Sequence, residues 1–167
     1  MGAHFYCYFT AYQDSIAAAL RALRETEFRA GRYLDAMEAA EHLSMYKLKF
    51  PPDANSPAPG PVHASIKETF NDFDGTGTRS IIDIMRVADE PDGCTASPLP
   101  EEDLILAFET IRPTRDMVEK AFVRHSYAAE QTIAPILGRI GRGEARYVIV
   151  YEEGKPSQIF FMGYSFD

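Results

Sequence analysis

The sequence predicts an α+β fold in a single domain, with a mixed sheet of about four strands that is packed by helices. Three runs, 4–10, 146–152 and 157–166, are rich in aromatic and β-branched residues, as strands are. Segment 16–28 instead repeats its apolar residues every three or four positions, which is typical of a helix. A chain of 167 residues can bury roughly 70% of its unfolded surface, so one domain, residues 1–167, needs no disulfide or metal to fold.

Residues 4–63 predict a strand, a helix and a long loop. In residues 4–10, apolar side chains occur at both odd and even positions, which indicates that both faces of the expected strand are covered by other parts of the protein. The helix that follows has Asp14 as a possible N-cap and Gly31 at its C′ position. Residues 33–49 have weaker helical periodicity. Five prolines make 50–63 a proline-rich loop, which we interpret as an insertion, with a lid as the alternative.

Three shorter helices and a strand are expected in the middle of the chain. Ser65 is expected to cap a short helix that ends at residue 70, and the run 80–87 predicts a strand. Pro98-Leu-Pro100, followed by three acidic residues, is typical of a helix start. Three residues of this helix are expected to face the core: Leu104, Ile105 and Phe108. Thr114 can cap the next helix.

The two C-terminal runs predict an antiparallel hairpin. Residues 153–156, Glu-Gly-Lys-Pro, separate 146–152 from 157–166, and both runs are apolar on both faces. An edge strand could not tolerate this pattern, so we expect the hairpin near the centre of the sheet with Phe160 and Phe161 buried. The protein is expected to be a monomer, or a homodimer if its helices are too few to cover both faces.

Charge and composition exclude several classes of function. There are 17 Lys and Arg residues against 25 Asp and Glu, and the net charge of −8 disfavours nucleic acid and anionic membranes. The N-terminus does not resemble a secretion signal, and no run of 18 apolar residues occurs. Cys7 and Cys94 form no metal-binding or disulfide pattern. We therefore expect a cytoplasmic protein without a cofactor.

A calcium loop is the most specific motif in the chain. Asp72, Asp74 and Asp83 occupy positions 1, 3 and 12 of such a loop. However, Thr76 replaces an expected carboxylate or amide and Arg79 places a cation where an apolar residue is normal. We favour a turn before a strand, and no metal.

The stretch 83–103 is strongly acidic. Six of its residues form the candidate partner-binding surface: Asp89, Glu90, Asp92, Glu101, Glu102 and Asp103. Such a run is most often a solvated face. The alternative is a docking surface for a basic protein, because clustered carboxylates accelerate encounter with cationic partners.

Five segments together resemble a family of small uncharacterised bacterial proteins. They are the region from Phe5 through the first helix, Ser80-Ile-Ile-Asp83, Cys94-Thr-Ala-Ser-Pro98, Arg112-Pro-Thr-Arg115 and the ending Gly163-Tyr-Ser-Phe-Asp167. The resemblance covers most of the chain. It implies a bacterial intracellular protein but no activity and no site residues.

Two functions remain open from the sequence. The favoured hypothesis is a non-catalytic interaction protein of the immunity or adaptor kind, which uses the acidic stretch. The alternative is a small enzyme or ligand-binding domain with a pocket under the proline-rich loop. Tyrosines would line that pocket (Tyr6, Tyr8 and Tyr164), and His4 or His63 would be its acid–base group.

Overall fold

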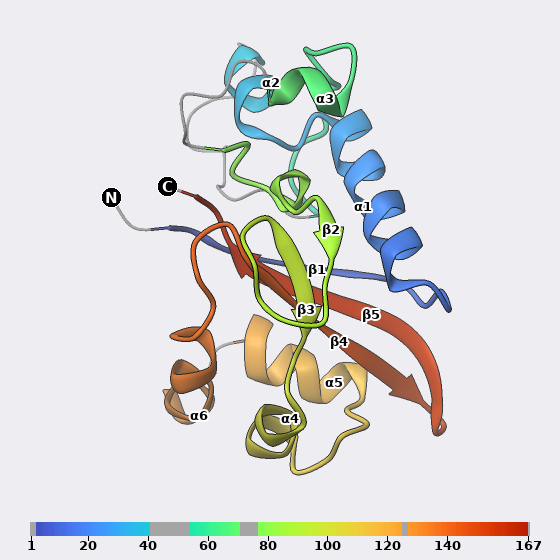
Figure 1. Ribbon diagram of the computed structural model, residues 1–167, viewed down its shortest axis with the longest axis vertical. Coiled ribbons are helices and arrows are strands. Elements are labelled where there is room, and N and C mark those ends of the chain that lie inside the picture. Colours follow the sequence, from blue (N-terminus) through green and yellow to red (C-terminus); the bar gives the residue numbers. More distant parts are fainter. Residues whose placement is uncertain (1–2, 41–53, 71–76, 125–126, 167) are drawn as a thin grey trace.

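A five-stranded mixed sheet runs through the middle of the molecule (Figure 1). The computed structural model describes residues 3–40, 54–70, 77–124 and 127–166. The strands are β1 (Phe5–Ala11), β2 (Arg86–Val87), β3 (Thr95–Pro98), β4 (Ala145–Glu152) and β5 (Lys155–Tyr164), in the order β1-β5-β4-β3-β2. The predicted α+β class and mixed sheet are confirmed, with five strands where about four were expected.

The C-terminal hairpin lies inside the sheet, as predicted. Strand β5 pairs antiparallel with both β1 and β4, whereas β2, β3 and β4 run parallel. The hairpin turn places Glu153 at φ 49° and Gly154 at φ 77°, and two positive φ angles in succession match the right-handed twist of the strands. Phe160 and Phe161 are both fully buried.

Helices cover both faces of this sheet. They are α1 (Ile16–Ala30), α2 (Leu34–Ala39), α3 (Ile66–Thr69), α4 (Glu101–Phe108), α5 (Arg115–Val118), which continues as a π-helical turn (Glu119–Val123), and α6 (Tyr127–Leu137). Helices α1, α2 and α3 lie on one side of the sheet and α4, α5 and α6 on the other (Figure 1). None of the helices among the described residues is long and apolar enough to cross a lipid bilayer.

Most of the predicted helix ends are confirmed. Gly31 ends α1 at φ 71°, and the Ser65 and Thr114 hydroxyls accept hydrogen bonds from the first turns of α3 and α5. The N-cap of α1 is Ser15 rather than Asp14, because the Ser15 Oγ accepts from the Ala18 N–H at 3.2 Å. Asp14 lies one residue earlier and is exposed.

The strand predicted over 80–87 is wrong in its first half. Residues Ile81–Asp83 form a 3₁₀ turn, and only Arg86–Val87 join the sheet. Ser80 explains this, because its Oγ accepts from the Ile82 N–H at 3.2 Å and so competes with a strand ladder. The apolar residues of this segment indicate that it is buried, but they do not indicate a strand.

Two hydrophobic cores flank the sheet. Phe160 packs with α4, α5 and α6, and Phe161 packs with α1. In α4, Phe108 is buried and Leu104 half-buried, as predicted, but Ile105 is 49% exposed. The prediction for Ile105 is wrong because it lies about 100° around the helix from Leu104, outside the narrow buried stripe. Asp103 occupies an inward position and is only 5% exposed.

The described part of the proline-rich loop, 54–63, packs along the end of α1. The Gly60 N–H donates to the Ala30 carbonyl at 3.1 Å, and the Arg32 Nε donates to the Ser56 carbonyl at 3.1 Å. Residues 50–53 lie outside the described residues. The loop therefore holds the C-terminal end of α1 in place.

Candidate functional site

A cavity of about 430 Å³ lies where the β2–β3 loop (88–94), the start of α4 and the end of α6 meet. Strand β3 leads directly into it, because the chain passes from Pro98 to α4 through only Leu99 and Pro100. The lining residues are Asp89, Glu90, Pro91, Ser97, Pro98, Leu99, Pro100, Glu102, Asp103, Ile136, Arg139, Ile140 and Arg146. Prolines and aliphatic side chains form its walls, and charged groups line the rest.

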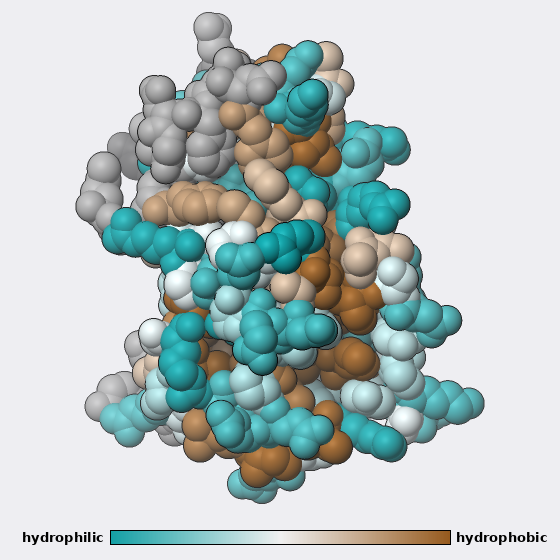
Figure 2. Space-filling model, viewed as in Figure 1, coloured by the Kyte–Doolittle hydropathy of each residue, from teal (hydrophilic) through white to brown (hydrophobic). Residues whose placement is uncertain are grey.

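Three of the predicted partner-binding acids line this cavity as exposed side chains. Asp89 and Glu90 come from the β2–β3 loop and Glu102 from the first turn of α4. The loop is held by Asp92, whose N–H donates to the Thr95 Oγ1 at 3.1 Å. Figure 2 shows hydrophilic residues over the middle of the same face, where the loop lies. The fold thus gathers acids from two segments around one opening.

The other three predicted acids differ in their surroundings. Asp92 is exposed and forms an ion pair with Arg86. Glu101 is exposed in the first turn of α4, where the helix dipole favours a carboxylate. Asp103 is buried and forms an ion pair with Arg139. The ion pair therefore largely neutralises the charge of Asp103. The acidic surface that remains consists mainly of the exposed acids in the β2–β3 loop and in the first turn of α4.

Sequence reasoning did not find two polar residues at the inner end of the cavity, Arg146 and Ser97. They are register partners on β4 and β3, and so they share one face of the sheet. This is the face of α4 and α6, because the other partner of Arg146 is Met162 in that core. Arg146 is 6% exposed and Ser97 is 1% exposed. An arginine inside the apolar run of β4 was the sequence signal for this site.

The guanidinium of Arg146 has few acceptors among the described residues. One nitrogen donates to the Ala145 carbonyl at 3.1 Å, and another donates to the Arg139 carbonyl at 3.4 Å. Glu144 comes within 3.6 Å, beyond hydrogen-bond distance, and its carboxylate already accepts from the Gly141 N–H. Two of five N–H groups are thus used. The buried Ser97 Oγ has no hydrogen-bond partner among the described residues.

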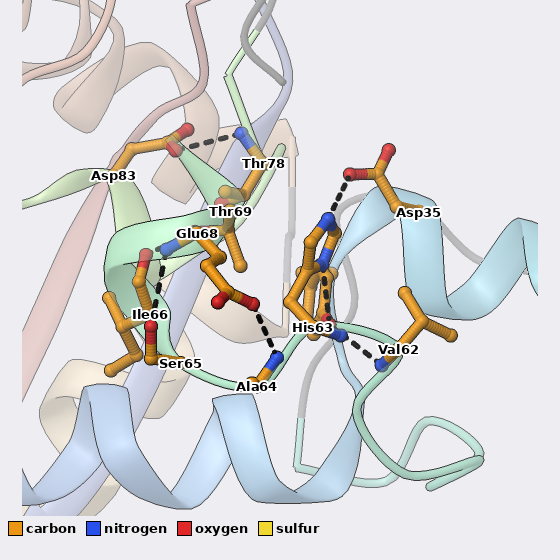
Figure 3. Close-up of polar contacts among 11 residues, drawn as sticks. Asp35, Val62, His63, Ala64, Ser65, Ile66, Glu68, Thr69, Thr78 and Asp83 are labelled. Atoms are coloured by element: carbon orange, nitrogen blue, oxygen red, sulfur yellow. Dashed lines mark hydrogen bonds and ion pairs between the residues drawn. The ribbon is translucent and has the colours of Figure 1, made fainter. Parts of the chain in front are cut away.

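His63 lies against Tyr33, a residue that sequence reasoning did not consider. The Tyr33 hydroxyl accepts from the Val62 and His63 N–H groups at 3.0 and 3.3 Å. The Tyr33 hydroxyl and the His63 Nδ1 share a hydrogen bond at 3.0 Å, and the Nε2 of His63 faces Asp35 at 3.7 Å (Figure 3). Tyr33 is fully buried, so this group fixes the proline-rich loop to the start of α2.

Replacing Tyr33 with phenylalanine tests this anchoring role. Tyr33→Phe leaves two backbone N–H groups without their acceptor, so we expect the free energy of unfolding to fall by about 1–3 kcal/mol in urea denaturation. Tyr6→Phe is the matched control, because the buried Tyr6 hydroxyl has no hydrogen-bond partner among the described residues. The control is expected to be neutral or stabilising. Equal losses in both variants would contradict the anchor.

The tyrosines of the predicted pocket do not lie together. Tyr6 and Tyr8 are buried in the core under α1, whereas Tyr164 packs against the core on the opposite face. Burial, and secondarily the charge of Asp83, raises the pKa of Tyr6 well above its ordinary value, so this phenol is a poor acid at neutral pH. The His4 backbone pairs with Ser165 at the end of the sheet.

Of the predicted calcium ligands, Asp72 and Asp74 lie outside the described residues. Asp83 is fully buried, and its carboxylate accepts from the Thr78 N–H at 2.8 Å (Figure 3). Within the described ranges, no three His, Cys, Asp or Glu side chains gather as metal ligands do. Asp83 thus stabilises the turn that precedes the 3₁₀ helix.

Cys7 and Cys94 are not joined in a disulfide, and both are half-buried. Burial raises the pKa of Cys94, and the charges of Asp83 and Asp92 raise it further. The thiolate is the reactive form, so a raised pKa makes Cys94 a weak nucleophile at neutral pH. The acids near Cys94 therefore work against a reactive thiol at this position.

A second cavity, of about 560 Å³, lies beside the β4–β5 hairpin and α5. Its cation, Arg115, already donates to Glu119 at 2.6 Å and to Gln158 at 3.0 Å. The guanidinium of Arg115 is thus paired within the protein, whereas Glu152 and Glu153 line the cavity as exposed acids. The cavity at Arg146 therefore offers more unused hydrogen-bonding groups.

No family model, curated protein sequence or solved structure matches this chain. The resemblance to small bacterial proteins thus stays a prediction from the sequence.

Proposed function

We propose that this protein is a non-catalytic interaction protein that binds a basic segment of a partner protein in the cavity between the β2–β3 loop and α4. The observation that carries the proposal is the convergence of Asp89, Glu90 and Glu102 on one opening. Four carboxylates line the cavity against two guanidinium groups, and the cavity is thus net acidic. Such a site attracts lysine or arginine side chains and repels acidic proteins.

The apolar walls of the cavity, like its acidic rim, favour the binding of a lysine or arginine side chain. Lysine and arginine carry an apolar stem below the charge, and that stem packs on apolar surface. Leu99, Ile136 and Ile140 supply that surface beside the exposed acids. A partner can therefore bury the stem of a side chain while its charge stays among carboxylates.

Exposed apolar residues on α4 support a protein partner. Ile105 and Leu106 are each 49% exposed, one turn beyond the acids that begin this helix. Figure 2 shows hydrophobic residues near the lower end of the molecule, where α4 lies. Apolar surface beside a charged rim is the usual composition of a protein interface.

Direct binding of a basic peptide tests the proposal. The probe is a fluorescein-labelled octapeptide with three internal lysines and a C-terminal carboxamide, followed by fluorescence anisotropy at 50 mM salt. The test variant combines Asp89→Asn, Glu90→Gln and Glu102→Gln. Each exposed charge contributes up to about 1 kcal/mol, so affinity should fall roughly tenfold or more. Binding should also weaken at 500 mM salt.

The control variant removes three exposed acids elsewhere: Asp14→Asn, Glu152→Gln and Glu153→Gln. It changes the net charge equally, so an effect of overall charge would appear in both variants. We expect it to bind like the parent protein. Equal weakening in the two variants, or no binding of any lysine peptide by the parent protein, would refute the proposed site.

A further inference from the structure

We infer that the cavity recognises the C-terminal residue of its partner, a lysine or arginine whose terminal carboxylate binds Arg146 and Ser97 while its side chain lies among Asp89, Glu90 and Glu102. This inference rests on the proposed function and specifies its ligand. It is based on the two polar residues at the inner end of the cavity, whose presence the binding of a basic side chain at the rim does not explain.

The first step is the incomplete pairing of Arg146. A buried charge is normally compensated by an opposite charge at hydrogen-bond distance. Here the two hydrogen bonds go to neutral carbonyls, and Glu144 forms an ion pair with Arg146 at 3.6 Å, which is too long for a hydrogen bond. A guanidinium in this state presents free N–H groups in the planar arrangement that suits a carboxylate.

The second step is the Ser97 hydroxyl. A buried hydroxyl without a hydrogen-bond partner destabilises the folded protein, and a bound ligand that accepts its hydrogen bond would remove that cost. Ser97 lines the same cavity and shares its sheet face with Arg146. The Ser97 Oγ itself is buried, so a carboxylate bound to the guanidinium would accept a hydrogen bond from this hydroxyl once the Ser97 side chain rotates toward the cavity.

The third step combines the two charges. The acids of the rim would repel a ligand that carried only a carboxylate, whereas a ligand that carried only a cation would bind the rim and leave the free N–H groups of Arg146 unused. A residue with both groups is compatible with both ends of the cavity. A C-terminal lysine or arginine is such a residue, and its aliphatic stem would pack on Leu99 and Ile140 between the charges.

Three fluorescein-labelled hexapeptides test the inference by anisotropy. The first ends in lysine with a free carboxylate, the second is the same peptide with a carboxamide, and the third ends in alanine with a free carboxylate. We expect the first to bind about tenfold or more tightly than the second, because hydrogen bonds to a charged group are stronger than neutral ones. The third should bind more weakly than the first.

Two variants assign the carboxylate preference to its residues. In Arg146→Gln, the ratio of carboxylate to carboxamide affinity should fall to near one. In Ser97→Ala, it should fall about threefold to tenfold while the melting temperature stays equal or rises, because the lost hydroxyl had no partner among the described residues. Arg142→Gln removes an exposed arginine outside the cavity and should leave the ratio unchanged. If Arg146→Gln does not fold, Ser97→Ala decides alone.

The outcomes separate this inference from the proposed function. Equal binding of the carboxylate and carboxamide peptides, with loss in the rim variant, would overturn the terminal-carboxylate inference and leave the basic-segment proposal standing. A preference that survives both Ser97→Ala and Arg146→Gln would also overturn it. Free lysine that competes as strongly as the first peptide would overturn the inference of a chain end. Absence of binding by all lysine peptides would refute both.

Discussion

Phe160→Ala and Phe161→Ala are each expected to lower the free energy of unfolding by about 3–5 kcal/mol. The two residues are adjacent on β5, both are fully buried, and they point into different cores. Each truncation leaves a cavity in a packed core that cannot fully close. Urea denaturation followed by circular dichroism measures the loss, and Val123→Ala, at a 44% exposed position, is the control with little expected change.

The comparison between the two phenylalanines is the informative part of this test. A sheet covered on one face only would lose stability in one variant and not in the other. We expect losses within about 1–2 kcal/mol of each other, since both side chains are equally buried. If either alanine variant does not fold, Phe160→Leu and Phe161→Leu give the same comparison with smaller losses. A loss confined to one variant would contradict two-sided cover.

Gly31→Ala is expected to destabilise the protein by about 2–4 kcal/mol, which corresponds to a fall in melting temperature of roughly 4–16 °C. Gly31 has φ 71°, and a Cβ atom there would lie 2.1 Å from the Gly60 carbonyl oxygen. The obstruction is backbone, so the loop that packs on α1 must move. Differential scanning calorimetry measures the shift.

Gly154→Ala separates the two causes of this effect. Gly154 has a similar φ of 77°, but no atom lies within 4 Å of where its Cβ would be. This control therefore carries the conformational penalty alone, about 1 kcal/mol. The difference between the variants gives the contribution of the contact between Gly31 and Gly60. Equal shifts would mean that the proline-rich loop does not hold the end of α1.

Sequence patterns predicted the parts of the fold that depend on neighbouring residues. The hairpin of β4 and β5 follows from two apolar runs and a short turn, and the end of α1 follows from Gly31. These features are decided within a few residues, where propensity and periodicity act. The 3₁₀ turn at Ile81–Asp83 escaped prediction because side chain–backbone hydrogen bonds replaced the strand ladder there.

The candidate site was only half predictable for the same reason. The acids at Asp89, Glu90 and Glu102 are close in sequence, so their clustering is visible without a structure. Arg146 meets Ser97 only because β3 and β4 pair in one particular register. Parallel pairing across a long connection leaves no local sequence pattern. The contact of His63 with Tyr33 was hidden likewise, because the two residues belong to separate segments.

The position of β1 determines when this fold can form during protein synthesis. Among the described strands, β1 pairs only with β5, so residues 5–11 have no sheet partner until residues 158–164 have left the ribosome. At about 5–20 residues per second, that interval is roughly ten to thirty seconds. Throughout it, the aromatic side chains Phe5, Tyr6 and Tyr8 lack the sheet that buries them. β1 therefore joins the sheet only after the C-terminal strand is available, later than the pairing of β2, β3 and β4 with one another.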